Sequence, residues 1–505
     1  MLVHEYLTRA ARRFPEKIAL RCGDSRLTYR ELYRSSTALA AFLVQNGLQR
    51  GDRVVILLEN SPEAVISLFA ALRAGGCYLI VNPRTPQERI AFIMNHSGAK
   101  FLVVSKNQLA WISASRHSFA DLRSVIFAGG TAPDDSYSDF ESACRTAESG
   151  SFPEPGEDDL ATILYTSGSA GVQKGVMLTH RNVDTVVSSV SEYLQHTSDD
   201  IVLGLLQLSF GYGLLQVLVT FKSGGRIVLE KGYGFPYDIV RRIKEERITG
   251  LAGVPTMFSL LLQLTSLEKE DLSSVRYLTN AAAALPPSFI PKLKSVFPAA
   301  KLYLMHGLTE CLRTTYLPPE ELDLRPTSVG KGMPNVELWI EDEDGKRIED
   351  GRTGELVVRG ANVMKGYWNA PDETARVLKP GRNSSERILH TGDLFRMDGD
   401  GYFYFVSRKD EMIKSRGEKV SPLEVENVIY TLDEIAEARV IGVPDAMLGQ
   451  AIKAEVVLKE GRGLSERDIL AVCKKHLEDY KVPHFVVFLP SLPKTLGGKI
   501  KRTIS

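Results

Sequence analysis

The chain has 505 residues, 44% of them hydrophobic and 25% charged, with 62 basic residues balancing 62 acidic ones. This length exceeds what one hydrophobic core supports, so we expect at least two domains. The balanced charge excludes a global field for nucleic acid or an anionic membrane, and no nucleic-acid partner is expected. The five cysteines form no CxxC pair, and neither a signal peptide nor an apolar run of spanning length is present. We therefore expect a cytoplasmic protein without integral membrane association.

The first third of the chain alternates helix and strand patterns. Thr28 and Glu31 form a capping box before an apolar-periodic stretch that runs to Gly47. This order of elements predicts parallel sheets covered by helices. The further predicted elements are strands at 53–58, 78–81 and 101–105, and a helix that begins at Asn60-Ser61-Pro62 and ends at Gly75-Gly76.

The pattern changes twice along the rest of the chain. Residues 134–159 lack periodicity and predict an irregular surface connection. Residues 335–404 alternate apolar and polar side chains around Gly-Asp turns, which predicts an antiparallel unit. The last residues carry their own helix and strand signals. The predicted fold class is therefore α/β and α+β: a large N-terminal domain of layered sheets with helices plus an antiparallel β unit over 1–409, and a small mobile α+β domain over 410–505.

The most informative segment follows an apolar run at 160–164. Hydroxyls, glycines and one lysine are typical of a loop that holds phosphate, because backbone N–H groups, hydroxyls and an ammonium all donate to an anion. A plain flexible Gly/Ser loop is the alternative. The Walker pattern does not fit, since Gln173 and Gly175 occupy the places of its second glycine and its Ser/Thr. The segment is Tyr165-Thr166-Ser167-Gly168-Ser169-Ala170-Gly171-Val172-Gln173-Lys174-Gly175.

This loop resembles the phosphate loop of the adenylate-forming superfamily, which includes acyl- and aryl-CoA synthetases, adenylation domains and luciferase. The usual form is Thr-Ser-Gly-Ser-Thr-Gly-x-Pro-Lys-Gly, so Ala170 and Gln173 are departures. Loss of the hydroxyl at Ala170 removes one hydrogen bond to a charged group, worth roughly 1.5–3 kcal/mol. The resemblance implies that ATP is bound by Thr166, Ser167, Gly168, Ser169, Gly171 and Lys174.

Further motifs occur in the superfamily's order. His306-Gly307-Leu308-Thr309-Glu310 resembles the segment whose ring lies on adenine, whose threonine meets the α-phosphate and whose glutamate holds Mg²⁺. Alone, such a Thr-Glu pair is more often a helix cap. The resemblance further implies nucleotide contacts from Ala281, Ala282, Ala283, His306 and Gly307, ribose contacts from Asp393 and Arg408, and a hinge at Asp410. Ser407 replaces the glycine usual before that arginine.

Two lysines complete the resemblance. Lys499, in the closing segment Pro493-Lys494-Thr495-Leu496-Gly497-Gly498-Lys499, corresponds to the adenylation lysine. Lys414, beyond the hinge, corresponds to the face used in the second step. The implied activity is ATP-dependent adenylation of an acyl or aryl carboxylic acid, then transfer to a pantetheine thiol of coenzyme A or of a carrier protein. A regulator that binds nucleotide without catalysis is the alternative from another class.

The position of Gly211 disfavours an α-amino acid, because amino-acid-activating domains carry an aspartate there. Arg313 could meet a second carboxylate of the acid, or could be paired structurally. Size selectivity does not follow from these residues. The expected pocket residues are Phe210, Gly211, Tyr212, Leu215, Leu278, Asn280, Met305, Arg313 and Thr314.

Overall fold

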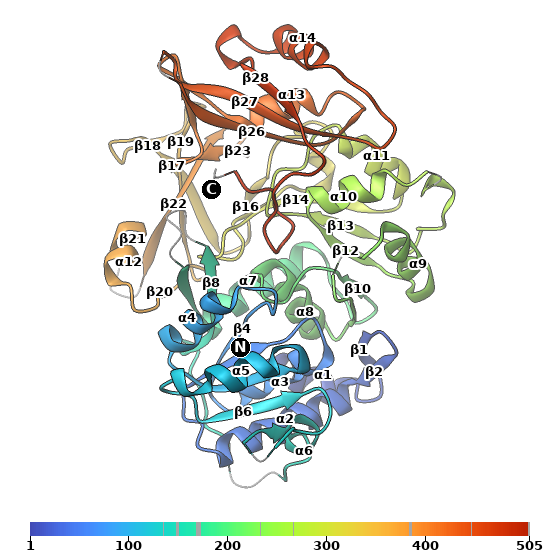
Figure 1. Ribbon diagram of the computed structural model, residues 1–505, viewed down its shortest axis with the longest axis vertical. Helices are drawn as coiled ribbons and strands as arrows, with labels where there is room; N and C mark the ends of the chain where they lie inside the picture. The colour runs from blue at the N-terminus through green and yellow to red at the C-terminus, as the bar shows by residue number, and fades with distance from the viewer. Residues whose placement is uncertain are drawn as a thin grey trace.

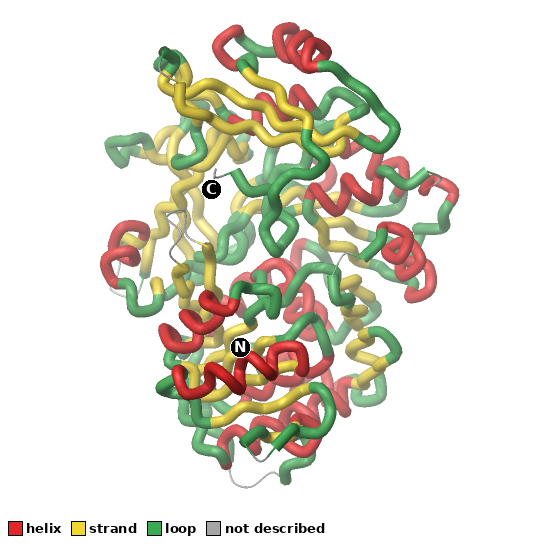
Figure 2. Tube along the Cα trace, viewed as in Figure 1, coloured by secondary structure: helices red, strands yellow, loops and turns green. Residues whose placement is uncertain are grey.

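The computed structural model describes residues 1–134, 136–147, 151–167, 173–232, 234–265, 267–382, 386–445 and 447–502. The molecule is elongated, with the N-terminal sheets at one end and the sheet of the last residues at the other (Figure 1). Figure 2 shows helices lying against strands in both halves of the larger part. Within the described ranges, no helix is both long and apolar enough to cross a membrane.

An eight-stranded sheet carries the hairpin of the predicted phosphate loop. Strand β3 pairs in parallel with β4 and β5, as the order of elements predicts. Every residue of β4 is buried, which suits a strand covered on both faces. The order is β20-β9-β8-β4-β3-β5-β6-β7, with bounds Gly366–Tyr367, Gln173–Thr179, Leu160–Ser167, Cys77–Ile80, Arg53–Leu57, Ala99–Ser105, Ser124–Ala128 and Ser138–Asp139.

A nine-stranded sheet places two predicted motifs side by side. Its central strands are parallel, and β13 pairs with β14 so that Asn280 lies opposite Leu304. Ligands of such sheets bind beyond the carboxyl ends of the strands. The order is β16-β15-β14-β13-β12-β10-β11-β1-β2, with bounds Lys331–Gly332, Thr315–Tyr316, Lys301–His306, Tyr277–Asn280, Gly250–Gly253, Ile201–Gly204, Arg226–Leu229, Ile18–Cys22 and Ser25–Thr28.

The antiparallel unit predicted over 335–404 is confirmed. Its strands pair antiparallel throughout, and Gly401 N donates to Asp398 O at 3.0 Å in the turn before β23. The order is β18-β17-β19-β22-β21, with β23 beside β22, and the bounds are Arg347–Ile348, Val336–Glu341, Gly354–Gly360, Arg387–Met397, Leu378–Pro380 and Phe403–Arg408.

The last residues form a smaller α+β unit with a core of its own. Ile413, Val440 and Ile469 belong to an apolar cluster whose members all come from this unit. The fold class is confirmed: a large α/β part with several sheets and a small α+β part. The small sheet has the order β25-β24-β27-β26 with β28 beside β27, and bounds Glu418–Val420, Ile413–Ser415, Gly449–Leu458, Ile435–Asp445 and Phe485–Phe488.

Side-chain caps begin several of the helices. The predicted capping box of Thr28 and Glu31 is confirmed at the start of α2, and Ser61 accepts a hydrogen bond from Ala64 N at the start of α3. The bounds are α1 Glu5–Arg13, α2 Tyr29–Gln45, α3 Pro62–Arg73, α4 Gln87–Ser97, α5 Lys106–Ser115, α6 Phe140–Ala143, α7 His180–Tyr193, α8 Gly211–Ser223, α9 Pro236–Glu246, α10 Pro255–Leu262, α11 Phe289–Val296, α12 Pro371–Val377, α13 Pro422–Ile429 and α14 Glu466–His476.

The prediction of an irregular connection over 134–159 is wrong for residues 138–143, which form β7 and α6. Asp139 caps this short helix by accepting from Ser142 N at 2.7 Å. Phe140 and Ala143 are buried on one face of the turn. A single helical turn is too short to produce a detectable period, so the surrounding polar residues hid it.

The small unit contacts the large one at several points. Ser259 Oγ donates to Ala436 O at 2.8 Å, and Thr256 Oγ1 donates to Gly498 O at 3.0 Å. In Figure 1 the final segment, dark red, descends from the small unit toward the centre of the molecule. The C-terminal segment therefore lies against the large part, near the ends of its parallel strands.

Candidate active site

The predicted phosphate loop connects the two strands of a hairpin. Thr166 on β8 pairs with Lys174 on β9, so the hydroxyl and the ammonium come from directly paired positions. Gly175 must be glycine, because a Cβ there would lie 2.8 Å from Cγ2 of Ile163. Outside the described residues lie Gly168, Ser169, Ala170 and Gly171, together with the side chain of Ser167.

Tyr367 connects this hairpin to the predicted magnesium ligand. Its hydroxyl donates to Oε1 of Glu310 at 2.8 Å, and Nζ of Lys174 lies 5.0 Å from its ring centroid. Burial and the neighbouring Glu310 raise the pKa of Tyr367 well above its usual value, so the phenol remains a donor. Oε2 of Glu310 forms no hydrogen bond with a described residue and is free for a ligand.

Glu310 fits magnesium better than it fits a metal that needs several side chains. Among the described residues, no cluster of three His, Cys, Asp or Glu side chains could hold a metal ion. Magnesium commonly takes one or two carboxylates, with phosphate oxygens and water completing its shell. The neighbouring Thr309 is partly exposed, and its hydroxyl forms no hydrogen bond with a described residue, so it too is available to a ligand.

Asp393, in the middle of β22, lies at the centre of a charged group. It is 4% exposed, Nη1 of Arg408 lies 3.1 Å from its Oδ1, and Nε2 of His306 lies 3.0 Å from its Oδ2. Burial opposes ionisation, but His306, Arg408 and Lys499 outweigh it and hold the pKa of Asp393 below its usual value. The group is therefore a buried carboxylate, as recognition of ribose hydroxyls would require.

His306 is fixed at both ring nitrogens. Nδ1 lies 2.8 Å from Oγ1 of Thr314. Because an ionised carboxylate can only accept, Nε2 donates the hydrogen bond to Asp393. The ring stacks on Phe405 at 6.0 Å and 22° and meets the ring of Phe395 edge-on at 4.9 Å. Adenine stacking stays a prediction, and it requires the face of His306 opposite Phe405.

The turn after β13 carries the three alanines expected beside the nucleotide. Ala282 has φ +70°, a left-handed conformation that costs a non-glycine residue roughly 1–2 kcal/mol. Asn280 Nδ2 donates to Ala283 O at 2.9 Å and so holds the turn. Ala281 is buried, whereas Ala282 and Ala283 are exposed. Because β13 and β14 are neighbours, this turn lies next to the segment that begins at His306.

Lys499 lies on a short hairpin that reaches the large part. Thr495 N donates to Lys499 O at 2.7 Å, and Gly498 O accepts from Thr256. The side chain of Lys499 is accessible to solvent, yet protein groups crowd it. This desolvation lowers the pKa of Lys499, while Glu411 and Asp393 oppose the decrease. The ammonium therefore lies within electrostatic reach of Asp393.

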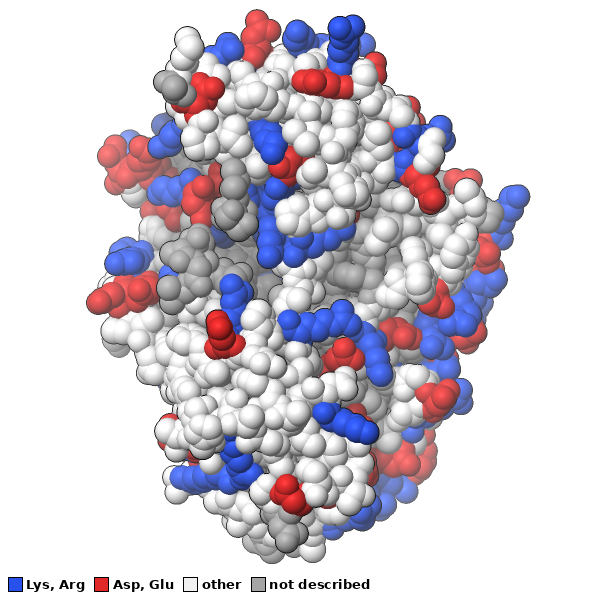
Figure 3. Space-filling model, viewed as in Figure 1, with Lys and Arg blue, Asp and Glu red and all other residues white. Residues whose placement is uncertain are grey.

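Figure 3 shows lysine and arginine side chains gathered beside a hollow in the middle of the molecule, beneath the small unit. Such a concentration of cations suits a ligand with several negative charges.

Lys414 lies away from this group, whereas Asp410 contacts its member Arg408. Lys414 is exposed on β24, and its backbone N donates to Oε1 of Gln450 at 2.7 Å. It contributes to lowering the pKa of Glu343, an effect that comes chiefly from Lys419. Asp410 is exposed, with its Oδ1 3.2 Å from Nε of Arg408. The structure thus brings Lys499, but not Lys414, toward Asp393.

The expected acid pocket lies where two apolar clusters meet. Tyr212 contacts both clusters, and its hydroxyl lies 2.6 Å from Oγ1 of Thr279. Leu215 belongs to one cluster and Leu278 to the other, so these two do not share one core. Met305 is buried and accepts a hydrogen bond at sulfur from the hydroxyl of Tyr193.

Glycines allow close packing at the entrance of this pocket. A Cβ at Gly211 would lie 2.9 Å from Cδ2 of Leu312, and one at Gly307 would lie 2.4 Å from Leu312 O. A Cβ at Gly497 would meet the Phe210 ring at 3.1 Å. The hairpin of Lys499 therefore rests against Phe210, at the helix that begins with Gly211.

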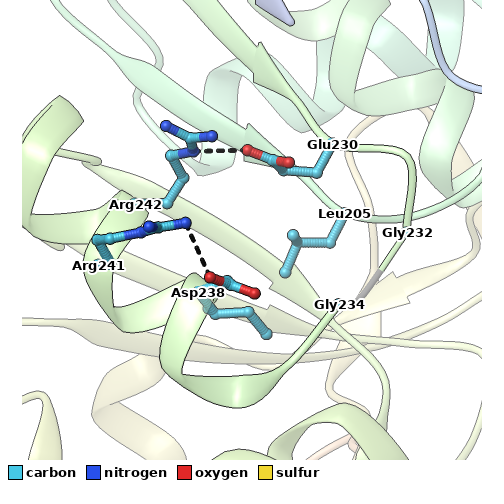
Figure 4. A pocket seen from close by; sticks show the side chains of 8 residues that line it. Leu205, Glu230, Gly232, Gly234, Asp238, Arg241 and Arg242 are labelled. Atoms are coloured by element: carbon cyan, nitrogen blue, oxygen red, sulfur yellow. Dashed lines mark hydrogen bonds and ion pairs between the residues drawn. The ribbon is translucent and has the colours of Figure 1, made fainter. Parts of the chain in front are cut away.

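A separate hollow of about 150 Å³ lies beside α9, between Glu230 and Gly234 (Figure 4). Its arginines are already paired: Arg242 Nε lies 2.7 Å from Oε1 of Glu230, and Arg241 Nη2 lies 2.8 Å from Oδ1 of Asp238. None of the predicted site residues lines it. This hollow therefore offers no free cation to an acid.

Sequence reasoning missed Tyr367, Phe405 and Thr256. Tyr367 follows a glycine in a two-residue strand, which gave no signal of its contact with Glu310. Phe405 stands between Tyr404 and Val406 in β23, so no apolar–polar alternation indicated which way its ring points. Thr256 reaches Gly498 from another part of the chain, and no local pattern could indicate that contact.

Together these contacts bring His306, Asp393 and Arg408 into one group and dock the hairpin of Lys499 on the large part. The family model described as "AMP-binding enzyme" matches residues 7–368, and that described as "AMP-binding enzyme C-terminal domain" matches residues 424–499. The chain belongs to this adenylate-forming family and is an enzyme of its AMP-forming acid–CoA ligase type.

Similar proteins agree along nearly the whole chain. A long-chain-fatty-acid–CoA ligase from Bacillus subtilis (strain 168) is 32% identical, with 98% of this chain and 92% of the relative covered. A feruloyl-CoA synthase from Amycolatopsis sp is 34% identical, with coverages of 97% and 96%. The crystal structure of the anthranilate CoA ligase AuaEII with anthranoyl-AMP has a TM-score of 0.91 at 26% identity, covering 99% of this chain and 95% of that one.

Proposed function

We propose that this enzyme adenylates an acyl or aryl carboxylic acid with ATP and then transfers the acyl group to coenzyme A. The observation that carries the proposal is the hairpin of Lys499, which is docked on the large part through the hydrogen bond from Thr256 to Gly498 O. Feruloyl and long-chain-fatty-acid ligases among the relatives support a carboxylic acid and coenzyme A as substrates.

In the first step the carboxylate attacks the α-phosphorus of ATP, pyrophosphate leaves, and an acyl-adenylate forms. Negative charge gathers at phosphorus, so the chain must supply fixed donors and cations there. Thr166, Lys174 and Thr309 would meet the phosphates, and Lys499 would lie between carboxylate and phosphate as a cation. Glu310 would hold Mg²⁺, which supplies Lewis-acid stabilisation of phosphate charge when bound.

Asp393 and Arg408 would orient the nucleotide through its ribose. The carboxylate is buried and held by His306 and Arg408, so it can accept from hydroxyls without moving, which favours the reacting geometry. The backbone after β13, at Ala281 to Ala283, would lie along the adenine. The loop residues Gly168, Ser169 and Gly171, with Ser167, belong to the same proposal through the family resemblance.

For the second step, residues 410–505 would turn about Asp410 relative to 1–409, withdrawing Lys499 and presenting the face of Lys414. The position of Lys414 supports this proposal, because it lies near Glu343 and away from Asp393 when Lys499 is docked. The thiol would then attack the acyl carbon and release AMP. A carrier-protein phosphopantetheine is the second candidate acceptor, and the cytoplasm is the proposed location.

Carboxylate-dependent exchange of pyrophosphate into ATP tests the first step across a panel of acids. Exchange with at least one acid, followed by thioester formation on adding coenzyme A, is the expected result. ATP binding without exchange for any acid would instead favour a regulator that binds nucleotide. Thioester formation with a holo carrier protein but not with coenzyme A would identify the other acceptor.

A further inference from the structure

Arg313 carries a buried charge without a partner. Its side chain is 3% exposed, and it forms no ion pair or hydrogen bond with any described residue. Its Nε is buried and unsatisfied. The ring of Tyr212 lies beside it, with the ring centroid 5.2 Å from Cζ. A cation–π contact offsets only part of the cost of burying a guanidinium, so an anionic partner is missing.

Other buried arginines of the chain have partners. Arg439 bonds Glu455 through both Nε and Nη2, and Arg359 donates to Glu337. Arg313 therefore differs from these buried arginines, because no described carboxylate pairs with its charge. Unpaired buried polar groups of this kind mark sites that a ligand completes.

The residue before Arg313 has a left-handed backbone conformation that turns the chain. Leu312 has φ +59°, which is unfavourable for leucine and occurs where surrounding structure imposes it. Leu312 fills the space beside Gly211 and Gly307, and the next side chain then packs over Tyr212. Thr314, which follows, bonds His306 at the nucleotide end. Arg313 thus lies between the nucleotide side and the acid pocket.

Arg313 gives the expected acid pocket a positive charge, whereas a pocket for an α-amino acid would carry a negative charge to bind the α-amino group. Gly211 supplies no carboxylate, and Leu312 occupies the space that a side chain there would need. A guanidinium prefers a planar carboxylate, which it can bind through two parallel hydrogen bonds.

We infer that the acid is a dicarboxylate: one carboxylate is adenylated and the other pairs with Arg313. This inference rests on the proposed adenylation and adds the class of acid to it. A bound dicarboxylate then supplies the anion that the apoenzyme lacks. A monocarboxylate of equal length has a neutral far end, so it leaves the guanidinium of Arg313 unpaired. Selectivity between the two follows from that difference.

Pyrophosphate exchange with matched acids tests this inference. The probes are malonate, succinate, glutarate and adipate, each beside its monomethyl ester and the monocarboxylate of equal chain length. We expect the wild-type enzyme to prefer at least one diacid, and Arg313→Met to lose about 10- to 100-fold in kcat/KM for that diacid but not for its ester. Arg313→Lys should retain part of the preference. Equal diacid-to-ester ratios in wild type and Arg313→Met would overturn the inference.

Thermal unfolding provides a readout that is independent of catalysis. Arg313→Met should leave the melting temperature of the apoenzyme unchanged or raise it, because the change removes an unpaired charge. Arg439→Met, the matched control, should lower it, because Glu455 loses its partner at Oε2 and keeps only Lys453 at Oε1. The preferred diacid should stabilise wild type but not Arg313→Met. A large destabilisation by Arg313→Met, with no diacid stabilising wild type, would show a structural arginine instead.

Different results would refute the proposed adenylation and the proposed dicarboxylate substrate. Exchange supported by monocarboxylates alone refutes the dicarboxylate and leaves adenylation standing. Absence of exchange with every acid refutes adenylation, while the unfolding experiment still decides whether Arg313 binds a second carboxylate.

Discussion

Lys499→Ala should slow the first half-reaction selectively. The hairpin that carries Lys499 is held by backbone atoms and by other side chains: Thr256 donates to Gly498 O, Lys494 pairs with Glu437 at 2.6 Å, and Arg439 donates to Lys501 O. None of these contacts uses the Lys499 ammonium. The substitution therefore removes one cation and leaves the hairpin docked.

The magnitude follows from the charge that is lost. A single preorganised donor aimed at developing charge is worth about 2.7–4 kcal/mol, which corresponds to about 10²–10³ in rate. Desolvation already lowers the pKa of Lys499, while Asp393 and Glu411 favour the charged form. We therefore expect kcat for pyrophosphate exchange to fall by about 10²–10³-fold, with a smaller change in the dissociation constant of ATP.

Two measurements make the test decisive. Exchange reports adenylation, and release of AMP from supplied acyl-adenylate with coenzyme A reports the second step, which should remain near the wild-type rate. Lys501→Ala is the matched control, because Lys501 is exposed and its side chain has no contact with Asp393 in the described structure. Wild-type exchange in Lys499→Ala, or an equal loss in Lys501→Ala, would refute the assignment.

Three further predictions concern Tyr367, Asp410 and His180. Tyr367→Phe removes the hydrogen bond to Glu310 and should lower kcat/KM for exchange by about 10-fold; an unchanged value would show that Glu310 needs no such support. Asp410→Pro removes no backbone hydrogen bond that the described structure contains at that N–H, so exchange should persist while thioester formation falls, and equal rates for both steps would contradict the hinge. Burial lowers the pKa of His180 to about 4 from 6.5. Between these two pH values the unfolded chain binds a proton at His180 that the native state does not. The free energy of unfolding therefore decreases as pH falls from 6.5 toward 4. Urea unfolding should show His180→Gln losing about 2 kcal/mol less than wild type between pH ~7.5 and pH ~5, whereas the exposed His117→Gln should match wild type.

Part of the site follows from local pattern alone. Asp393 and Arg408 lie on either side of the Gly-Asp turn at 398–401, so a hairpin brings them near each other. A register shift between Leu394 and Phe395 then places Asp393 opposite Arg408. The turn is visible in the sequence, whereas the shift is not, because it depends on how the strand packs.

Other contacts could not be predicted, because they join distant parts of the chain. The bond from His306 to Asp393 spans 87 residues, and both ends had been assigned separately to adenine and ribose. The isolation of Arg313 is likewise a property of the folded core. The sequence was compatible with Arg313 being paired or unpaired, and only its neighbours in the folded structure distinguish these two possibilities.

The contact between the two units is made of weak parts. Three neutral hydrogen bonds, from Thr256, Ser259 and Ser421, reach backbone carbonyls, each contributing about 1 kcal/mol. Lys292 pairs with Asp433 in solvent, where such pairs add little, and Phe289 meets the edge of Tyr430 at 5.8 Å. The proposed turn about Asp410 would therefore need no energy from ATP, because thermal fluctuation would be enough to separate the two units at such a boundary.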